Sequence, residues 1–364
     1  MQARIPYGKP YVDSLRRSYR DAETGEVAVV VAQAVLIFSA FVAFILQSAL
    51  LSSLLFVFLL VTGYGWKAYQ ETTAKSLTFM MTASTVTILG LIAVFLFLRA
   101  MPVLELMGAN IIIPPGEEMW RPSTGGAGTY NLIPMIWGTA VTTVVAMLVA
   151  GPLGIAGAVF LGEFAPSRVR AFMKPAVETL AGVPSIVYGF IGFTVINPYF
   201  NIEMSAGIGT LFAVGLVIGL MALPTVVSVA EDAISTVPDA TKDGSVAMGA
   251  TNWQTTKSVT IPAAFSGVSA ALLLGIGRAM GETMAATVMI AHAQILPEPL
   301  YDVFDNTETL TTLIAGNFGP AEGTEFYLSG LFAAGVVLFV IVTGLGIVAQ
   351  LIERRMERKL GGET

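Results

Sequence analysis

An arginine and a glutamate stand four residues apart in an otherwise apolar stretch. Arg278 and Glu282 both lie within the apolar segment 262–292. Residues four apart share one face of a helix, so the two side chains could form an ion pair. A charge in hydrocarbon costs about 2.5 to 3.5 kcal/mol on insertion scales, so we expect both to face a helix bundle or a water-filled cavity. There, the guanidinium could replace an anion's hydration with planar, bidentate donors, or the two residues could merely neutralise each other between helices.

A second candidate feature is formed by Pro184, Ser185 and Tyr188. Proline frees a backbone carbonyl within a helix, and a serine or tyrosine hydroxyl could satisfy it. We predict a helix break here that lines a path through the protein, although packing alone explains these residues almost as well.

The remaining ionisable residues favour structural roles. Lys174 and Glu178 have the spacing of a solvated pair near the start of a helix. His292 is the only histidine, and one imidazole makes no metal site. The absence of cysteine excludes disulfides, thiolate metal sites and a cysteine nucleophile. We therefore expect no cofactor, no metal and no enzyme active site.

The composition is that of a protein whose solvent is lipid. Of its 364 residues, 55% are hydrophobic and 12% are charged, against roughly a quarter charged in an ordinary soluble domain. The mean hydropathy is +0.75. A net charge of -6 gives no basic footprint for nucleic acid. These values predict an all-α, polytopic transmembrane helical bundle.

Several apolar segments approach the ~20 residues that a helix needs to cross a bilayer. Residues 27–66 form almost one apolar run, which as a single helix would be ~60 Å long. We therefore expect this run to fold back near Gln47 and Ser48 as a hairpin, giving about eight helices in all. The predicted crossings are 27–46, 49–66, 84–104, 132–160, 176–197, 207–229, 262–292 and 327–351, with outer loops at 105–131 and 294–325.

The distribution of Lys and Arg predicts the orientation. With the N-terminus in the cytoplasm, that side holds every Lys and Arg except Arg99, Arg121 and Arg278. By the positive-inside rule, both termini are expected in the cytoplasm. The predicted parts are a cytoplasmic N-terminal tail (1–26), an extra transmembrane hairpin (27–66), a six-helix core (67–355) and a cytoplasmic C-terminal tail (356–364).

The loop 230–262 is polar enough to leave the membrane, yet it keeps a helical pattern. A first short amphipathic helix is predicted to end at Gly249, and a second to begin near Asn252, a plausible N-cap, and run to Val259. Pro262 would start the next crossing. The pattern fits equally a surface that docks a partner protein and a linker that lies on the membrane.

This loop resembles the EAA coupling loop of ABC-importer permeases. That pattern is Glu-Ala-Ala, three residues, Gly, nine residues and Ile-x-Leu-Pro. In this chain, Asp243-Gly244-Ser245 occupies the positions of Glu-Ala-Ala. The acidic residue is kept, but the helix is weakened, because glycine lowers helix stability by ~1 kcal/mol relative to alanine. The matching positions are Asp243, Gly244, Ser245, Gly249, Ala250, Val259, Ile261 and Pro262.

The resemblance extends over about residues 80 to 355 and is to the phosphate-specific permease of the PstC type. The related PstA type shares parts of these motifs. The runs that carry it are Trp137-Gly138-Thr139, Gly162-Glu163-Phe164-Ala165-Pro166, Gly182 to Gly189 (GVPSIVYG) and Gly277 to Ala285 (GRAMGETMA).

The resemblance implies a type I ABC-importer permease core in the cell membrane, importing inorganic phosphate. It also implies a heterodimer with a PstA-like permease, two copies of a PstB-like ATPase and a PstS-like extracytoplasmic phosphate-binding protein. A separate ATPase agrees with the absence of a Gly-x-x-x-x-Gly-Lys-Ser/Thr phosphate loop. The residues expected along the substrate pathway are Arg278, Glu282, Thr283, Ser185 and Tyr188.

Other functions stay open at this point. The chain could be a permease for another oxyanion, such as molybdate, sulfate or phosphonate. A secondary carrier that works without an ATPase is a weaker alternative, because such carriers usually contain internal repeats and none is visible. An intramembrane enzyme would need a nucleophile and a base together, which one histidine without cysteine does not supply.

Overall fold

The computed structural model describes residues 24–113, 119–123, 128–204 and 206–359. They fall into two compact units, 1–92 and 93–364. The predicted N-terminal tail (1–26) lies almost wholly outside the described residues, and the C-terminal tail (356–364) lies partly outside them.

The first unit is a helical hairpin followed by the beginning of a third helix. Helices α2 (Thr24–Ile45) and α3 (Leu50–Ala68) pack against each other. The chain reverses at Gln47, whose φ of 50° is in the left-handed region, so the fold-back is where the sequence predicted it. The buried Gln33 donates to Thr62 (3.1 Å) and accepts from Ser76 (2.6 Å), and these bonds join α2 to α3 and to the start of α4 (Gln70–Met107).

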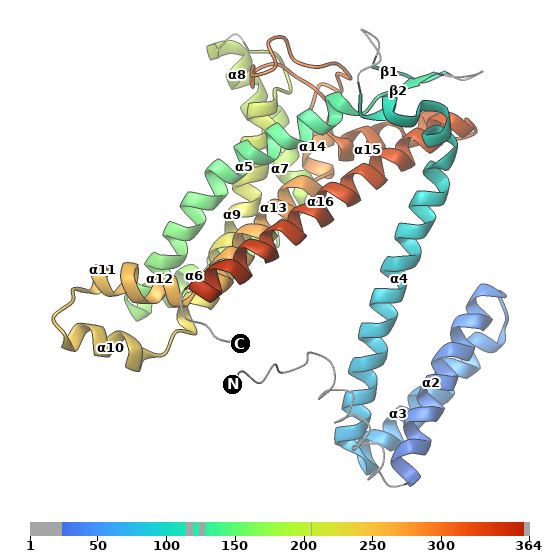
Figure 1. The fold of residues 1–364 in the computed structure, drawn as a ribbon, viewed down its shortest axis with the longest axis vertical. Helices are drawn as coiled ribbons and strands as arrows, with labels where there is room; N and C mark the ends of the chain where they lie inside the picture. Colours follow the sequence, from blue (N-terminus) through green and yellow to red (C-terminus); the bar gives the residue numbers. More distant parts are fainter. Residues whose placement is uncertain (1–23, 114–118, 124–127, 205, 360–364) are drawn as a thin grey trace, which may run out of the picture. The chain divides into compact units, whose positions relative to one another are not determined.

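The second unit is built around three long helices. Helices α5 (Ile133–Val159), α9 (Leu211–Ser235) and α13 (Phe265–Gly281) pack against one another, as Figure 1 shows. Small side chains such as Ala150 and Ala222 are fully buried between them, which lets the helix backbones approach closely. Helix α16 (Glu325–Lys359) packs on α13 and on α15 (Leu310–Ala321).

Shorter elements complete the second unit. They are η1 (Gly108–Ile111), β1 (Trp120–Arg121), β2 (Thr129–Tyr130), η2 (Phe160–Phe164), α6 (Ser167–Ala181), α7 (Ser185–Ile191), η3 (Gly192–Ile196), α8 (Asn197–Met204), α10 (Asp239–Ala247), α11 (Asn252–Thr255), η4 (Thr256–Thr260), α12 (Ile261–Ala263) and α14 (Met284–Met289). The strands β1 and β2 pair antiparallel within the predicted outer loop 105–131.

Six helices in the described part of the chain are long and apolar enough to cross a membrane, and two bent pairs raise the number to as many as eight. The fold class is therefore the predicted one, a multi-pass bundle of transmembrane helices. The bent pairs are 167–181 with 185–203, at 86°, and 252–263 with 265–281, at 73°.

The structure corrects several predicted boundaries. The predicted crossing 176–197 is broken between Ala181 and Ser185. The predicted segment 262–292 ends as a helix at Gly281 and resumes only as α14. The outer loop 294–325 contains α15, because its acidic residues flank an apolar stretch instead of interrupting it. Helix α9 extends past the predicted residue 229 to Ser235, since the acid near its end, Glu231, is buried against a lysine of α6.

Candidate functional site

The helix break after α13 is held open by Glu282. This residue has extended backbone angles, with φ of -66° and ψ of 123°. Its carboxylate accepts a hydrogen bond from the backbone N–H of Ala285 (3.0 Å), and its carbonyl accepts one from the hydroxyl of Thr311 (2.8 Å). Both ends of the broken backbone thus find partners within the protein, the condition for non-helical backbone at membrane depth.

Arg278 and Glu282 do not form the predicted ion pair. The helix ends between them, so the spacing of four residues no longer puts them on one face, and no ion pair joins them in the described structure. Instead, the Arg278 guanidinium donates to the hydroxyl of Thr225 on α9 (3.3 Å). The arginine side chain is exposed on the surface of this single chain.

The predicted break at Pro184 lies beside the break at Glu282. Helix α6 ends at Ala181 and α7 begins at Ser185, and the half-buried Tyr188 donates from its hydroxyl to the carbonyl of Leu180 (3.3 Å). Helix α7 packs directly on α14. A Cβ atom at Gly189 would lie 2.7 Å from the Cα of Ala285, so this approach requires glycine.

Thr283 is the other predicted pathway residue. Its hydroxyl donates to the carbonyl of Gly281 (3.1 Å), and its own carbonyl accepts from Thr287 (2.7 Å). Ser185 is half-buried at the start of α7. The structure therefore brings the segments of all five predicted pathway residues to the ends of α7, α13 and α14, without a direct contact between Arg278 and Glu282.

Sequence reasoning missed a layer of threonines that supports this region. The hydroxyl of Thr139 on α5 accepts the backbone N–H of Leu310 (3.0 Å), and Thr309 caps α15. Thr307 donates to the carbonyl of Ile295 (2.6 Å). The sequence feature that could have predicted these bonds is the run Thr307-Glu308-Thr309-Leu310-Thr311-Thr312, because threonine hydroxyls cap the N-termini of helices.

His292 has a buried acidic partner that the sequence did not reveal. Its Nδ1 lies 2.7 Å from a carboxylate oxygen of Glu308, whose side chain is fully buried, and its Nε2 lies 3.2 Å from the carbonyl of Thr287. Gln294 also donates to Glu308 (3.1 Å). Burial raises the pKa of Glu308, and the hydrogen bonds from His292 and Gln294 lower it by less.

The predicted coupling loop forms two short helices at one end of the bundle (Figure 1). Helix α10 contains Asp243, Gly244 and Ser245, and none of its residues is buried. Gly249 follows with a φ of 92°, a left-handed conformation that favours glycine. Met248 is 86% exposed, so the apolar face of this loop has no cover within the described chain.

The second helix of the loop begins at Asn252, as predicted, but its N-cap is a different residue. Thr251, not Asn252, is the N-cap, and it forms a capping box with Gln254. Ala250 is half-buried and its N–H bonds the carbonyl of Ser245 (3.3 Å). The motif positions Val259, Ile261 and Pro262 are also half-buried, at the bend into α13.

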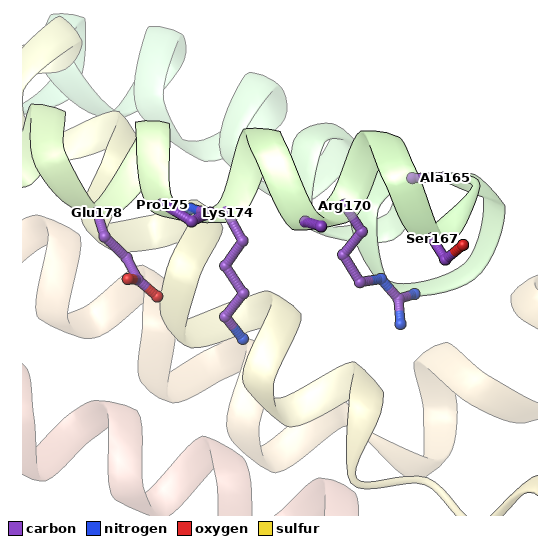
Figure 2. A pocket seen from close by; sticks show the side chains of 7 residues that line it. Ala165, Ser167, Arg170, Lys174, Pro175 and Glu178 are labelled. Carbon is purple, nitrogen blue, oxygen red and sulfur yellow. The ribbon is translucent and has the colours of Figure 1, made fainter.

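Lys174 and Glu178 do not form the predicted pair. The Lys174 ammonium binds Glu231 (2.6 Å) and Asp232 (2.8 Å) at the end of α9, and the Glu231 side chain is only 4% exposed. Figure 2 shows Arg170, Lys174 and Glu178 along α6, where they line a cavity of about 500 Å³. Arg170 in turn donates to the carbonyls of Leu161 (2.6 Å) and Gly162. Both cations of the cavity therefore already have partners.

The described residues contain no group of three His, Asp or Glu side chains that could hold a metal. No residue of the sites above is arranged as a nucleophile with a base. The arrangement places two helix breaks side by side, with α7 packed on α14, and leaves the α10–α11 loop exposed.

Comparison with known proteins identifies the family. Residues 150–358 match the model of the binding-protein-dependent transport system inner membrane component. A probable ABC transporter permease protein, YqgH of Bacillus subtilis, is 40% identical over 61% of this chain and 71% of its own length. The phosphate transport system permease protein PstC of Mesorhizobium japonicum is 34% identical over 75% of this chain and 87% of its own. A crystal structure of a bacterial alginate ABC transporter aligns with a TM-score of 0.49 at 15% identity, over 82% of this chain and 98% of the other.

The sequence relatives are transport permeases, and they share most of their length with this chain. It is therefore a multi-pass membrane protein that acts in transport and not as an enzyme. It belongs to the family of binding-protein-dependent transport system inner membrane components, as a permease of the PstC type.

Proposed function

We propose that this chain is one of two permease subunits of an ATP-driven importer of inorganic phosphate. The second subunit is a PstA-like permease, and the path runs between the two. Two PstB-like ATPase copies supply the energy, and a PstS-like protein delivers phosphate from outside. The observation that carries the proposal is the exposed Arg278 guanidinium beside the broken α13, with the hydroxyl of Thr225 as its partner in this chain.

Among the described residues, the Arg278 guanidinium has the Thr225 hydroxyl as a partner but forms no ion pair with a carboxylate. Arg278 lies in one of the bent helix pairs that can span the membrane. Facing lipid would leave its charge unpaired in hydrocarbon, which is costly. A second permease subunit enclosing a water-filled path would remove that cost and offer the arginine to a passing anion.

The ligand fits the chemistry of the side chain. Phosphate carries a charge of -1 to -2 and loses hydration on entering the membrane, and the planar fork of arginine matches two of its oxygens. Glu282 lies at the same helix break, but its carboxylate already accepts a hydrogen bond from the Ala285 N–H. We assign Glu282, Thr283, Ser185 and Tyr188 to shaping the path around the anion.

The energy must enter through the exposed loop 239–263. Its apolar residues Val246, Met248 and Trp253 are exposed in the chain alone. We assign this loop to the ATPase interface, with both chain termini on the same, cytoplasmic side, as the Lys and Arg distribution predicts.

The test is phosphate uptake by the four-component system in liposomes. Arg278→Ala is expected to abolish uptake while the complex still assembles. Arg354→Ala, at an exposed arginine near the end of α16, is the matched control and is expected to transport normally. Normal uptake by Arg278→Ala would reject the assigned role. Competition of labelled phosphate by molybdate, sulfate and phosphonate separates phosphate from the other oxyanions.

A further inference from the structure

One ion pair connects the loop 239–263 to a helix that the loop does not join in sequence. The Lys242 ammonium on α10 lies 2.8 Å from a carboxylate oxygen of Glu163. Glu163 belongs to η2, the five-residue π-helical turn at the end of α5. The side chains are 17% and 10% exposed, so both charges are largely removed from water.

A pair of this kind depends on both members. A largely buried charge that loses its partner is strongly unfavourable, because it keeps its desolvation cost without the compensating attraction. The other acid near Lys242 is Asp239 at 3.8 Å, and its side chain is 92% exposed. Glu163 is therefore the partner that decides where Lys242 lies.

The Glu163 end of the pair is fixed in place. The Arg170 guanidinium of α6 donates to the carbonyls of Leu161 and Gly162 within η2. The turn closes with a hydrogen bond from the Ala165 N–H to the carbonyl of Phe160 (2.7 Å). These bonds attach η2 to α6 as well as to α5, so a force on Glu163 acts on both helices.

The second half of the loop contacts the same turn. The rings of Phe164 in η2 and Trp253 in α11 have centroids 6.2 Å apart. Ser245 of α10 and Thr255 of α11 are joined by a hydrogen bond of 3.1 Å. Both loop helices thus meet one turn of five residues and are tied to each other.

This arrangement gives the loop a route to α5 that the chain connectivity lacks. Through the backbone, α10 follows α9 and α12 precedes α13. We propose that Glu163 and Lys242 are positioning residues that pass movement of the loop to α5 and α6, so that all the helices around the path move as one body. This role rests on the proposed function, because it assumes that an ATPase moves the loop.

The experiment measures the ratio of phosphate transported to ATP hydrolysed by the reconstituted complex, and compares this ratio between variants and wild type. Lys242→Met and Glu163→Ala are expected to keep ATP hydrolysis and to lower this ratio about tenfold. The charge swap Glu163→Lys with Lys242→Glu is expected to restore most of it. Lys67→Met, at an exposed lysine outside this loop, is the matched control and is expected to keep the wild-type ratio.

The outcomes separate the two proposals. A wild-type complex that moves no phosphate rejects the proposed function. A wild-type complex that transports, with both single variants at the wild-type ratio, rejects the link alone. If a single variant fails to assemble, the swap decides: assembly with a restored ratio supports the pair, and a swap as impaired as the single variants overturns it.

Discussion

The two ends of the second unit are held together by different interactions. At the α10–α11 end, ion pairs join segments that are distant in sequence. At the α14–α15 end, hydroxyl groups form hydrogen bonds with backbone atoms. The first end has Glu163 with Lys242, and Lys174 with Glu231. The second end has Thr311 on the carbonyl of Glu282 and Thr139 on the N–H of Leu310. In the function proposed above, the charged end receives a force and the hydroxyl end keeps broken helices open.

The difference follows from the range of the two interactions. Attraction between charges falls off slowly with distance and tolerates some change in geometry, so it can persist while elements move. A hydrogen bond is short and directional, and it satisfies a backbone group without adding net charge. Irregular backbone at membrane depth requires the second kind, because lipid offers no partner.

The largest expected effect is at the charged end. Lys174→Met leaves the buried Glu231 with no cation and is expected to reduce the free energy of unfolding by about 2 to 3 kcal/mol, a value discounted because the Lys174 side chain is 35% exposed. The measurement is the midpoint of thermal unfolding in detergent, with Glu178→Gln as the control. An equal loss in the control would favour the pairing first expected from sequence.

The next effect concerns a single hydroxyl at the other end. Thr139→Val leaves the N–H of Leu310 buried without a partner and is expected to cost about 2 kcal/mol. Thr142 is equally buried but donates only within its own helix, so Thr142→Val is the matched control and should cost less. Equal costs in thermal unfolding would mean that the bond to α15 is not what supports this end.

One acid departs from this division. At the hydroxyl end, the fully buried carboxyl group of Glu308 lies 2.7 Å from Nδ1 of His292, and burial raises the pKa of Glu308. This end is therefore expected to respond to pH.

The sign follows from the raised pKa of Glu308, whose chief cause is burial. An acid with a raised pKa in the folded state contributes stability below its unfolded pKa and loses it as the pH rises through the folded one. We expect the free energy of unfolding to fall as the pH rises above the usual glutamate range, by at most about 1.4 kcal/mol per pH unit, and the midpoint of thermal unfolding in detergent to fall with it. Glu308→Gln should flatten this slope, while Glu298→Gln, at an exposed acid, should leave it unchanged.

The sequence predicted most of what depends on local pattern. Hydrophobicity and length predicted the long apolar helices, although the predicted segments 176–197 and 262–292 are broken. Spacing located the two helices of the loop and the turn at Gly249. These features need only neighbouring residues, since an apolar run or a glycine followed by a motif can be seen within a short window.

The partners of the charged residues could not be predicted in the same way. Lys174 bonds to Glu231, which is 57 residues away, instead of Glu178 on its own helix. Likewise, the end of α13 at Gly281 depends on Thr311, which is 29 residues from Glu282. Spacing predicts which residues share a helix face, but packing between helices decides which of them meet.

The smallest expected effect separates two glycines of the same loop. Gly244 lies inside α10 with open space around its α-carbon, so Gly244→Ala should stabilise the helix by about 1 kcal/mol. Gly249 also has open space but a φ of 92°, so Gly249→Ala should cost about 1 kcal/mol through backbone strain alone. Thermal unfolding measures both changes, and ATPase binding measures their consequence. If the unfolding midpoints shift in opposite directions and only Gly249→Ala weakens ATPase binding, the interface depends on the turn at Gly249. If Gly244→Ala weakens ATPase binding instead, the interface needs the flexibility of glycine within α10, and this prediction is wrong.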